Sequence, residues 1–181
     1  MANDIRVDTA ARTLTLGDLT VPCVIGKGGA LPGVDKREGD GATPLGRWPV
    51  RAVLLRRDRV ERALVPALPW RWIGQGDGWC DDGRDAAYNR PVTLPYAPSH
   101  ERLWREDQAY DVIVVLGHND APPVPAMGSA IFFHQWVPGE DGLPKDTEGC
   151  VALSPESMRA VLPLLRTGLA MEIFGGGCRT Y

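Results

Sequence analysis

The sequence places one cysteine where a thiol could do chemistry. Cys150 follows Gly149 and precedes a short apolar run that leads into a predicted helix. A buried cysteine usually only fills space, whereas a thiol that its surroundings activate is a nucleophile. Because a free thiol has a pKa of about 8.5, catalysis at neutral pH requires a base within hydrogen-bond reach. The rest of the chain has to supply that base.

Three histidines are available as partners for Cys150, and their surroundings differ. His100 lies in a charged polar stretch, His118 follows one apolar run, and His134 ends another. A side chain at the end of a strand projects from a rigid edge, so His134 is the predicted base. A metal site would need a third ligand beside the cysteine and one histidine, and no spacing provides it. We therefore predict neither a metal nor another cofactor.

The turn before the predicted helix could also stabilise negative charge. The backbone N–H groups of Gly149 and Cys150 are expected to face a developing oxyanion. One such donor typically contributes about 3–4 kcal/mol of transition-state stabilisation. The nucleophile, the base and the oxyanion donors together would make a site for nucleophilic catalysis.

Composition sets the limits for the whole chain. Its 181 residues predict a single domain over 1–181. Apolar residues make up 44% and charged residues 24%, which is typical of a globular protein. The net charge of −3 argues against nucleic acid as a partner, and no run approaches the ~20 apolar residues of a membrane span. No signal peptide is visible in "MANDIRVDTAART", which leaves open a cytoplasmic protein or a sequence without its export signal.

The elements that must position the thiol and its base are mostly short β runs. They predict a mainly β fold, an antiparallel β-sandwich or open barrel, with one or two short helices. The expected strands cover 5–8, 12–16, 20–26, 46–55 paired with 62–66, 111–117, 128–134 and 168–175.

The helices are expected to be few. Ser154 is a good N-cap, Pro155 suits the first helical position, and Pro163 should end or kink the helix. A second helical turn is predicted over 100–107. The acidic residues between 77 and 85 miss the spacing of an EF-hand and are interpreted as a solvated loop.

Two segments carry a resemblance to a known family. "HQWVPGEDGLPKDTEGC" resembles the signature of the L,D-transpeptidase (YkuD-type) family, and "GATPLGRWPV" resembles its Thr-Pro-x-Gly-x-Phe element, with Trp48 in the aromatic position. The resemblance covers about residues 20–175. It implies a YkuD-like, mainly β catalytic domain that remodels peptidoglycan.

The resemblance also implies a mechanism and a set of roles. Cys150 would attack an L,D bond of a stem peptide, or its L-Ala–diaminopimelate bond, and form a thioester acyl-enzyme. The amine of a second stem would resolve this intermediate to give a cross-link. His134 takes the role of base, Gly149 belongs to the oxyanion wall, and Thr147 fills the hydroxyl position. Stem peptides and glycan strands are the implied partners, carbapenem-type β-lactams the inhibitors, and the periplasm or cell envelope the location.

The chain departs from the family pattern near the thiol. Glu148 stands where histidine is common, and a carboxylate there raises a neighbouring thiol's pKa unless it points outward or pairs with a cation. Ala152 stands where arginine or asparagine is common. We therefore expect another arginine to supply the cation, with Arg90 in "YNRPV" as the leading candidate and Tyr88 beside it. The alternative is that this stretch is only a structural loop.

Three further residues complete the predicted substrate-binding set. Trp136 lies two residues beyond the base and is the best candidate for a cleft wall, while His118 and Asn119 follow the apolar run 111–117. Other functions stay open at this stage. They are an L,D-carboxypeptidase or murein amidase with water as acceptor, a non-catalytic peptidoglycan-binding module and, more remotely, a sortase-like enzyme.

Overall fold

The computed structural model describes residues 4–61, 64 and 66–175. The strands are β1 (Ile5–Asp8), β2 (Thr13–Leu16), β3 (Leu19–Val24), β4 (Ala30–Pro32), β5 (Thr43–Leu55), β6 (Trp70–Trp72), β7 (Asp77–Cys80), β8 (Pro91–Thr93), β9 (His100–Arg102), β10 (Val112–Leu116), β11 (Phe132–Gln135), β12 (Val151–Leu153) and β13 (Ala170–Phe174). The helices are α1 (Pro155–Val161) and the short 3-10 helices η1 (Gly33–Asp35) and η3 (Leu162–Leu164). The prediction of a mainly β fold is confirmed.

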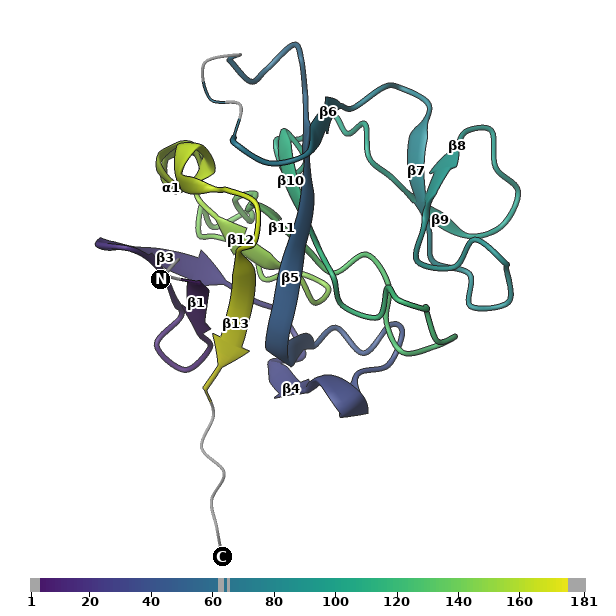
Figure 1. The fold of residues 1–181 in the computed structure, drawn as a ribbon, viewed down its shortest axis with the longest axis horizontal. Coiled ribbons are helices and arrows are strands. Elements are labelled where there is room, and N and C mark those ends of the chain that lie inside the picture. Colours follow the sequence, from purple (N-terminus) through teal and green to yellow (C-terminus); the bar gives the residue numbers. More distant parts are fainter. Residues whose placement is uncertain (1–3, 62–63, 65, 176–181) are drawn as a thin grey trace, which may run out of the picture.

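The main sheet closes on itself. Its strands follow the order β10-β11-β12-β3-β2-β1-β13-β5-β4, and β5 also pairs with β10. The long β5 makes this closure, because its middle part pairs with β13 and its last part pairs with β10 (Figure 1). Closure leaves fewer unpaired sheet edges than an open barrel would. Most pairs are antiparallel, as expected, but β11 pairs with β12 in parallel, and this pair holds the predicted base beside the thiol.

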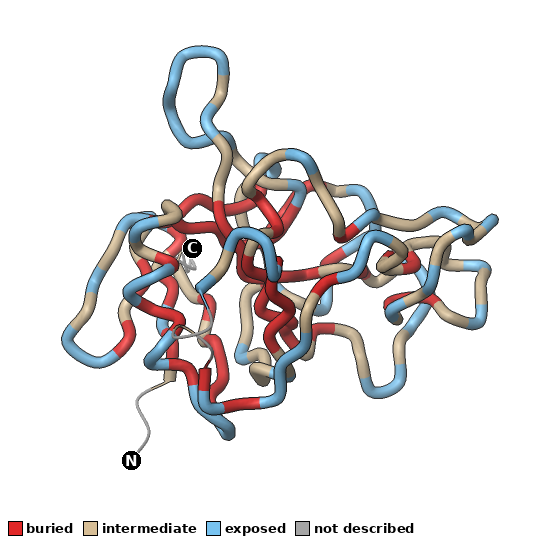
Figure 2. The backbone as a smooth tube through the Cα atoms, turned by 90° about the horizontal axis from the view of Figure 1, so that it is seen from above, coloured by how far each residue is buried: buried red, intermediate tan, exposed pale blue. Residues whose placement is uncertain are grey.

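Apolar side chains from both sides of the barrel form the core. All five residues of β10 are buried, as are the four of β11 and the three of β12. Buried backbone gathers in the middle of the molecule, while exposed loops lie at its periphery (Figure 2). The continuous apolar runs therefore mark strands that are covered on both faces.

A second, three-stranded sheet of order β8-β7-β9 lies to one side of the barrel (Figure 1). A shared apolar cluster joins it to the main sheet, and this cluster includes Trp79, Leu103, Tyr110 and Phe132. The prediction of a helical turn over 100–107 is wrong. His100–Arg102 is strand β9, because pairing with β7 satisfies its backbone groups better than an isolated turn does.

Helix α1 begins and ends as the sequence predicts. The Ser154 side chain accepts a hydrogen bond from the Ser157 N–H, Pro155 opens the first turn, and Pro163 falls in the 3-10 turn that ends the helix. No helix in the described part of the chain is long and apolar enough to cross a membrane. The expected strand over 62–66 includes residues 62, 63 and 65, which lie outside the described residues.

Candidate active site

The parallel pair β11–β12 brings the thiol and the imidazole together. Phe133 pairs with Val151 and His134 with Ala152, so Cys150, directly before β12, lies level with Phe132. Side chains two residues apart on a strand share a face, and paired residues share it too. The side chains of Cys150 and His134 therefore project from the same face of the sheet, and both line one cavity of about 450 Å³.

The backbone between 130 and 132 holds the thiol on both sides. The Phe132 N–H donates to Cys150 Sγ over 3.3 Å, and the thiol donates to the Ala130 carbonyl over 3.3 Å. Burial, and then the charge of Glu101, raises the pKa of the Cys150 thiol to about 12. The Cys150 side chain is therefore a neutral thiol whose proton points to a carbonyl.

A backbone carbonyl fixes the tautomer of His134. Nδ1 lies 2.7 Å from the Gln135 carbonyl oxygen, and because a carbonyl can only accept, Nδ1 carries the proton and Nε2 keeps its lone pair. Burial lowers the pKa of His134 to about 4. The Tyr110 ring packs edge-on against the imidazole, with 5.1 Å between centroids. The imidazole is thus neutral, oriented and ready to accept a proton at Nε2.

The backbone conformation of the turn before Cys150 depends on Gly149 and Thr147. Gly149 has a φ of +139°, and a Cβ at this position would lie 2.9 Å from the Ala42 carbonyl oxygen. The Thr147 hydroxyl accepts from the Gly149 N–H over 3.2 Å and donates to the Cys150 carbonyl over 2.6 Å. Because the Gly149 N–H is occupied, the Cys150 N–H is the better oxyanion donor, and it has no hydrogen-bond partner among the described residues.

Two of the predicted substrate-binding residues line this cavity, namely Glu148 and Trp136. Glu148 is exposed and pairs with Lys27, with 2.7 Å between the carboxylate and the ammonium. Glu148 thus points outward and pairs with a cation, and both features reduce its effect on the thiol pKa. Its charge still contributes to the raised pKa of Cys150.

Arg90 and Tyr88 do not line the cavity that holds the thiol. The Arg90 guanidinium donates to the carbonyls of Asn89 and Asp120 and faces a second cavity of about 410 Å³. Arg90 is therefore fixed to the backbone away from the thiol. Tyr88 is buried, and its hydroxyl donates to the carboxylate of Glu38, which does line the cavity that holds Cys150.

His118 and Asn119 also lie outside the cavity. His118 donates from Nε2 to the Met127 carbonyl over 3.0 Å and packs edge-on against Trp48. Asn119 has a φ of +48°, and its amide donates to the Gly128 carbonyl over 2.9 Å. Both side chains hold the proline-rich loop between 120 and 128.

Sequence reasoning missed Asn89, which supports the thiol from behind. Its amide oxygen accepts from the Ala130 N–H over 3.1 Å and from the Trp79 indole over 2.9 Å. Its amide nitrogen donates to the carbonyls of His118 and Asn119. Asn89 thus holds Ala130 at a φ of +50°, where the Ala130 carbonyl meets the thiol. The only signal was its position between the two residues singled out in "YNRPV".

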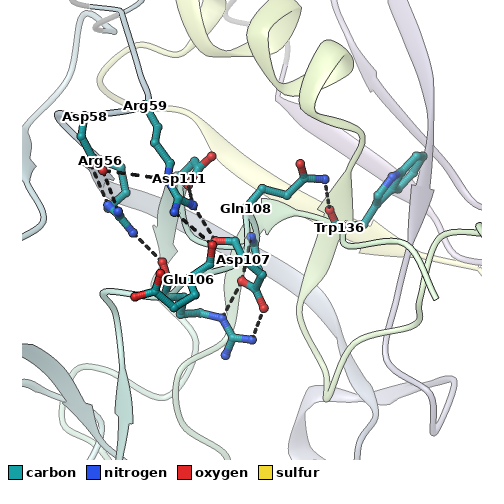
Figure 3. Close-up of polar contacts among 10 residues, drawn as sticks. Arg56, Asp58, Arg59, Glu106, Asp107, Gln108, Asp111 and Trp136 are labelled. Atoms are coloured by element: carbon teal, nitrogen blue, oxygen red, sulfur yellow. Dashed lines mark hydrogen bonds and ion pairs between the residues drawn. The ribbon is translucent and has the colours of Figure 1, made fainter. Parts of the chain in front are cut away.

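The segment 105–111 forms another part of the cavity that the sequence did not indicate. Arg56 donates to the Arg105 carbonyl over 2.6 Å, and Arg59 donates to the carbonyls of residues 106 and 107 (Figure 3). Gln108 then donates to the Trp136 carbonyl over 3.2 Å. These contacts fix a segment that carries three cavity-lining residues, Arg105, Ala109 and Tyr110.

The site and the fold define a thiol–imidazole centre on a closed, mainly β scaffold. The family model of the YkuD L,D-transpeptidase catalytic domain matches residues 2–173. The chain therefore belongs to this family of cysteine-dependent L,D-transpeptidases that act on peptidoglycan. No curated protein and no solved structure matches the chain. Within the described residues, no group of three or more potential metal ligands lies together.

Proposed function

We propose that this protein is a peptidoglycan L,D-transpeptidase in which Cys150 is the nucleophile and His134 the base. One observation carries the proposal. The two side chains project from the same face of β11–β12 into one cavity, and the bond from Nδ1 to the Gln135 carbonyl leaves Nε2 free as the base. The family supports the substrate class, and the geometry supports the assignment of roles.

In the acylation step, the thiol proton moves to His134 Nε2 as the sulfur attacks the carbonyl carbon of the scissile bond. Because the resting groups are both neutral, proton transfer accompanies the attack rather than preceding it. The Cys150 N–H stabilises the oxyanion. The C–N bond then breaks, the imidazolium returns its proton to the leaving amine, and a thioester remains on Cys150.

In the second step, the amine of another stem peptide attacks the thioester carbonyl. His134 accepts the proton that this amine loses and passes it to the departing sulfur. A C–N bond forms, the C–S bond breaks, and the neutral thiol is restored. Both L,D and L-Ala–diaminopimelate bonds suit this chemistry, and hydrolysis by water in place of the amine is the second candidate function.

Residues around the dyad are proposed to bind the stem peptide. Trp136 and Glu148 line the cavity, and Arg105 lines it as well. Arg105 is therefore a better candidate than Arg90 for the cation that the family pattern places near the thiol. Glycan strands as partners, acylation by carbapenem-type β-lactams and an envelope location are further parts of the proposal.

Incubation with purified muropeptides tests the reaction. Wild type should produce cross-linked dimers that mass spectrometry detects, and Cys150→Ala should produce none. Trimmed monomers without dimers would assign a hydrolase, and the absence of any product in the presence of both donor and acceptor would contradict the proposed activity.

A further inference from the structure

The catalytic cavity has a wall whose charge the acyl-transfer steps above do not use. Trp79 in β7 pairs with Glu101 in β9, and Asp81 lies two residues beyond Trp79. Alternation along the strand therefore places the carboxylates of Asp81 and Glu101 on the same face of the small sheet. Both residues line the cavity that holds Cys150.

Glu101 is held firmly by one oxygen only. The Tyr110 hydroxyl donates to Glu101 Oε1, and the Tyr110 ring in turn packs against His134. Glu101 Oε2 has no hydrogen-bond partner among the described residues, and Asp81 Oδ1 is buried without one. One fixed oxygen and one unpaired oxygen make Glu101 an oriented acceptor beside the dyad.

Among the described residues, these two carboxylates also have no salt-bridge partner. Five acidic residues but only three basic ones line the cavity. Two of the five acidic residues have cations outside the lining, since Glu148 pairs with Lys27 and Asp146 with Arg12. The Arg105 guanidinium near Glu101 pairs with Asp107. Within the described residues, neither Asp81 nor Glu101 takes part in an ion pair. A partly enclosed cavity with uncompensated negative charge attracts cations.

We propose that Glu101 binds a primary ammonium group of the stem peptide and so makes the cavity selective for amine-bearing substrates. The proposal rests on the function above, because transpeptidation requires an amine that is protonated at neutral pH before it reacts. Asp81 adds negative charge to the same side of the ligand. The ammonium belongs either to the donor stem or to the acceptor stem, and the chemistry of recognition is the same for both.

Occupation of this site would also affect the nucleophile. After burial, the Glu101 carboxylate is the largest contribution to the raised pKa of the Cys150 thiol. An ammonium group beside Glu101 offsets that charge and lowers the cost of forming a thiolate. The empty cavity is therefore less reactive than the cavity with an amine-bearing substrate.

Glu101→Gln is the test variant, because a glutamine oxygen still accepts from Tyr110 while the charge is lost. Glu140→Gln is the matched control, since Glu140 is exposed and outside the cavity lining. The donor arm compares acylation of Cys150 by a stem peptide with a free side-chain amine and by its N-acetylated form. If the donor stem supplies the ammonium, wild type and the control should prefer the free amine by about 10- to 100-fold, the range of one charged hydrogen bond.

The acceptor arm starts from an acyl-enzyme made with the acetylated donor. Its cleavage is followed against the concentration of an amine-bearing acceptor peptide. Glu101→Gln should lose the discrimination in the donor arm, or it should require about 10-fold more acceptor in this arm. Unchanged behaviour in both arms overturns the proposal. If no stem peptide acylates wild type, the proposed function fails instead, so the two failures are distinguishable.

A third measurement uses no substrate amine. Alkylation of Cys150 by neutral iodoacetamide, followed by peptide mass mapping, should be about 3- to 10-fold faster in Glu101→Gln at pH 8, because one pKa unit changes the thiolate fraction tenfold. If Glu101→Gln reacts faster with iodoacetamide and also loses its preference for the amine, the loss of preference reflects lost recognition and not a damaged fold. Equal or slower alkylation overturns the electrostatic part. Asp81→Asn should show smaller changes in the same directions, and it serves as the test if Glu101→Gln does not fold.

Discussion

The two walls of the catalytic cavity are built on different principles. The wall formed by β11 and β12 is fully buried, and it holds His134 and Cys150 through strand register and backbone hydrogen bonds. The opposite wall, formed by Asp81 directly after β7, by Glu101 of β9 and by the segment 105–111, is half-exposed and carries charged side chains. In the proposed function, the first wall performs the chemistry and the second selects the ligand.

The largest effect is expected from a substitution in the wall formed by β11 and β12, here called the chemical wall; the opposite wall is called the recognition wall. His134→Gln removes the base but retains a polar side chain of similar reach. General base catalysis typically contributes 10²- to 10⁴-fold, so we expect kcat for cross-linking to fall by about that factor with little change in substrate affinity. Steady-state kinetics with a defined donor and acceptor measure it. A variant that retains more than a tenth of wild-type kcat would remove the base from the account.

Asn89 connects the two walls, and its loss should disturb both. Asn89→Ala leaves the Ala130 N–H and the Trp79 indole without their acceptor. Unsatisfied buried groups cost about 1–3 kcal/mol each, so we expect a loss of about 3 kcal/mol in the free energy of unfolding. Urea denaturation measures the stability. Iodoacetamide labelling of Cys150 should change as well, because the Ala130 carbonyl no longer holds the thiol. A loss below about 0.5 kcal/mol would show that the two walls are independent.

The buried imidazole predicts a pH dependence of stability. Burial lowers the pKa of His134 to about 4, against about 6.5 in the unfolded chain. The unfolded state therefore binds a proton more readily than the folded state. The resulting contribution of the neutral, buried His134 to the free energy of unfolding is fully present above pH 6.5 and is lost as the pH falls toward 4. It amounts to about 3 kcal/mol.

Urea denaturation of wild type and His134→Gln at pH 7 and pH 4 isolates that contribution. The variant should lose less stability than wild type over this interval. His118, whose pKa burial also lowers, contributes part of the slope in both proteins. Parallel losses in the two proteins would mean that His134 is not buried as a neutral group.

The smallest expected effect concerns Arg90. Its guanidinium is bound to backbone carbonyls and faces the second cavity, so Arg90→Ala should change kcat/KM on diaminopimelate stems by less than about 3-fold. The same kinetic assay measures it. A loss of 10-fold or more would bring Arg90 back as a substrate-binding residue and would extend the recognition wall to the second cavity.

The sequence predicted the chemical wall better than the recognition wall, for a physical reason. Continuous apolar runs and the Gly149–Cys150 motif report on local backbone requirements, and these predicted the strands, the helix start and a thiol and an imidazole that line one cavity. Glu101 and Asn89 act through partners far along the chain, and nothing near them in sequence carries that information. The prediction of a helical turn over 100–107 included Glu101. Because it assigned this residue to the wrong element, it gave no indication that the Glu101 side chain lines the cavity.

The central claim is that Cys150 becomes acylated by a stem peptide. Intact-protein mass spectrometry after mixing with a stem-peptide donor tests it directly. Wild type should gain the mass of the acyl group without its leaving amine, and fragmentation should place that mass on Cys150, while Cys150→Ala gains none. An adduct of the same mass on Cys150→Ala, or one in wild type located on Cys23 or Cys80, would contradict the account.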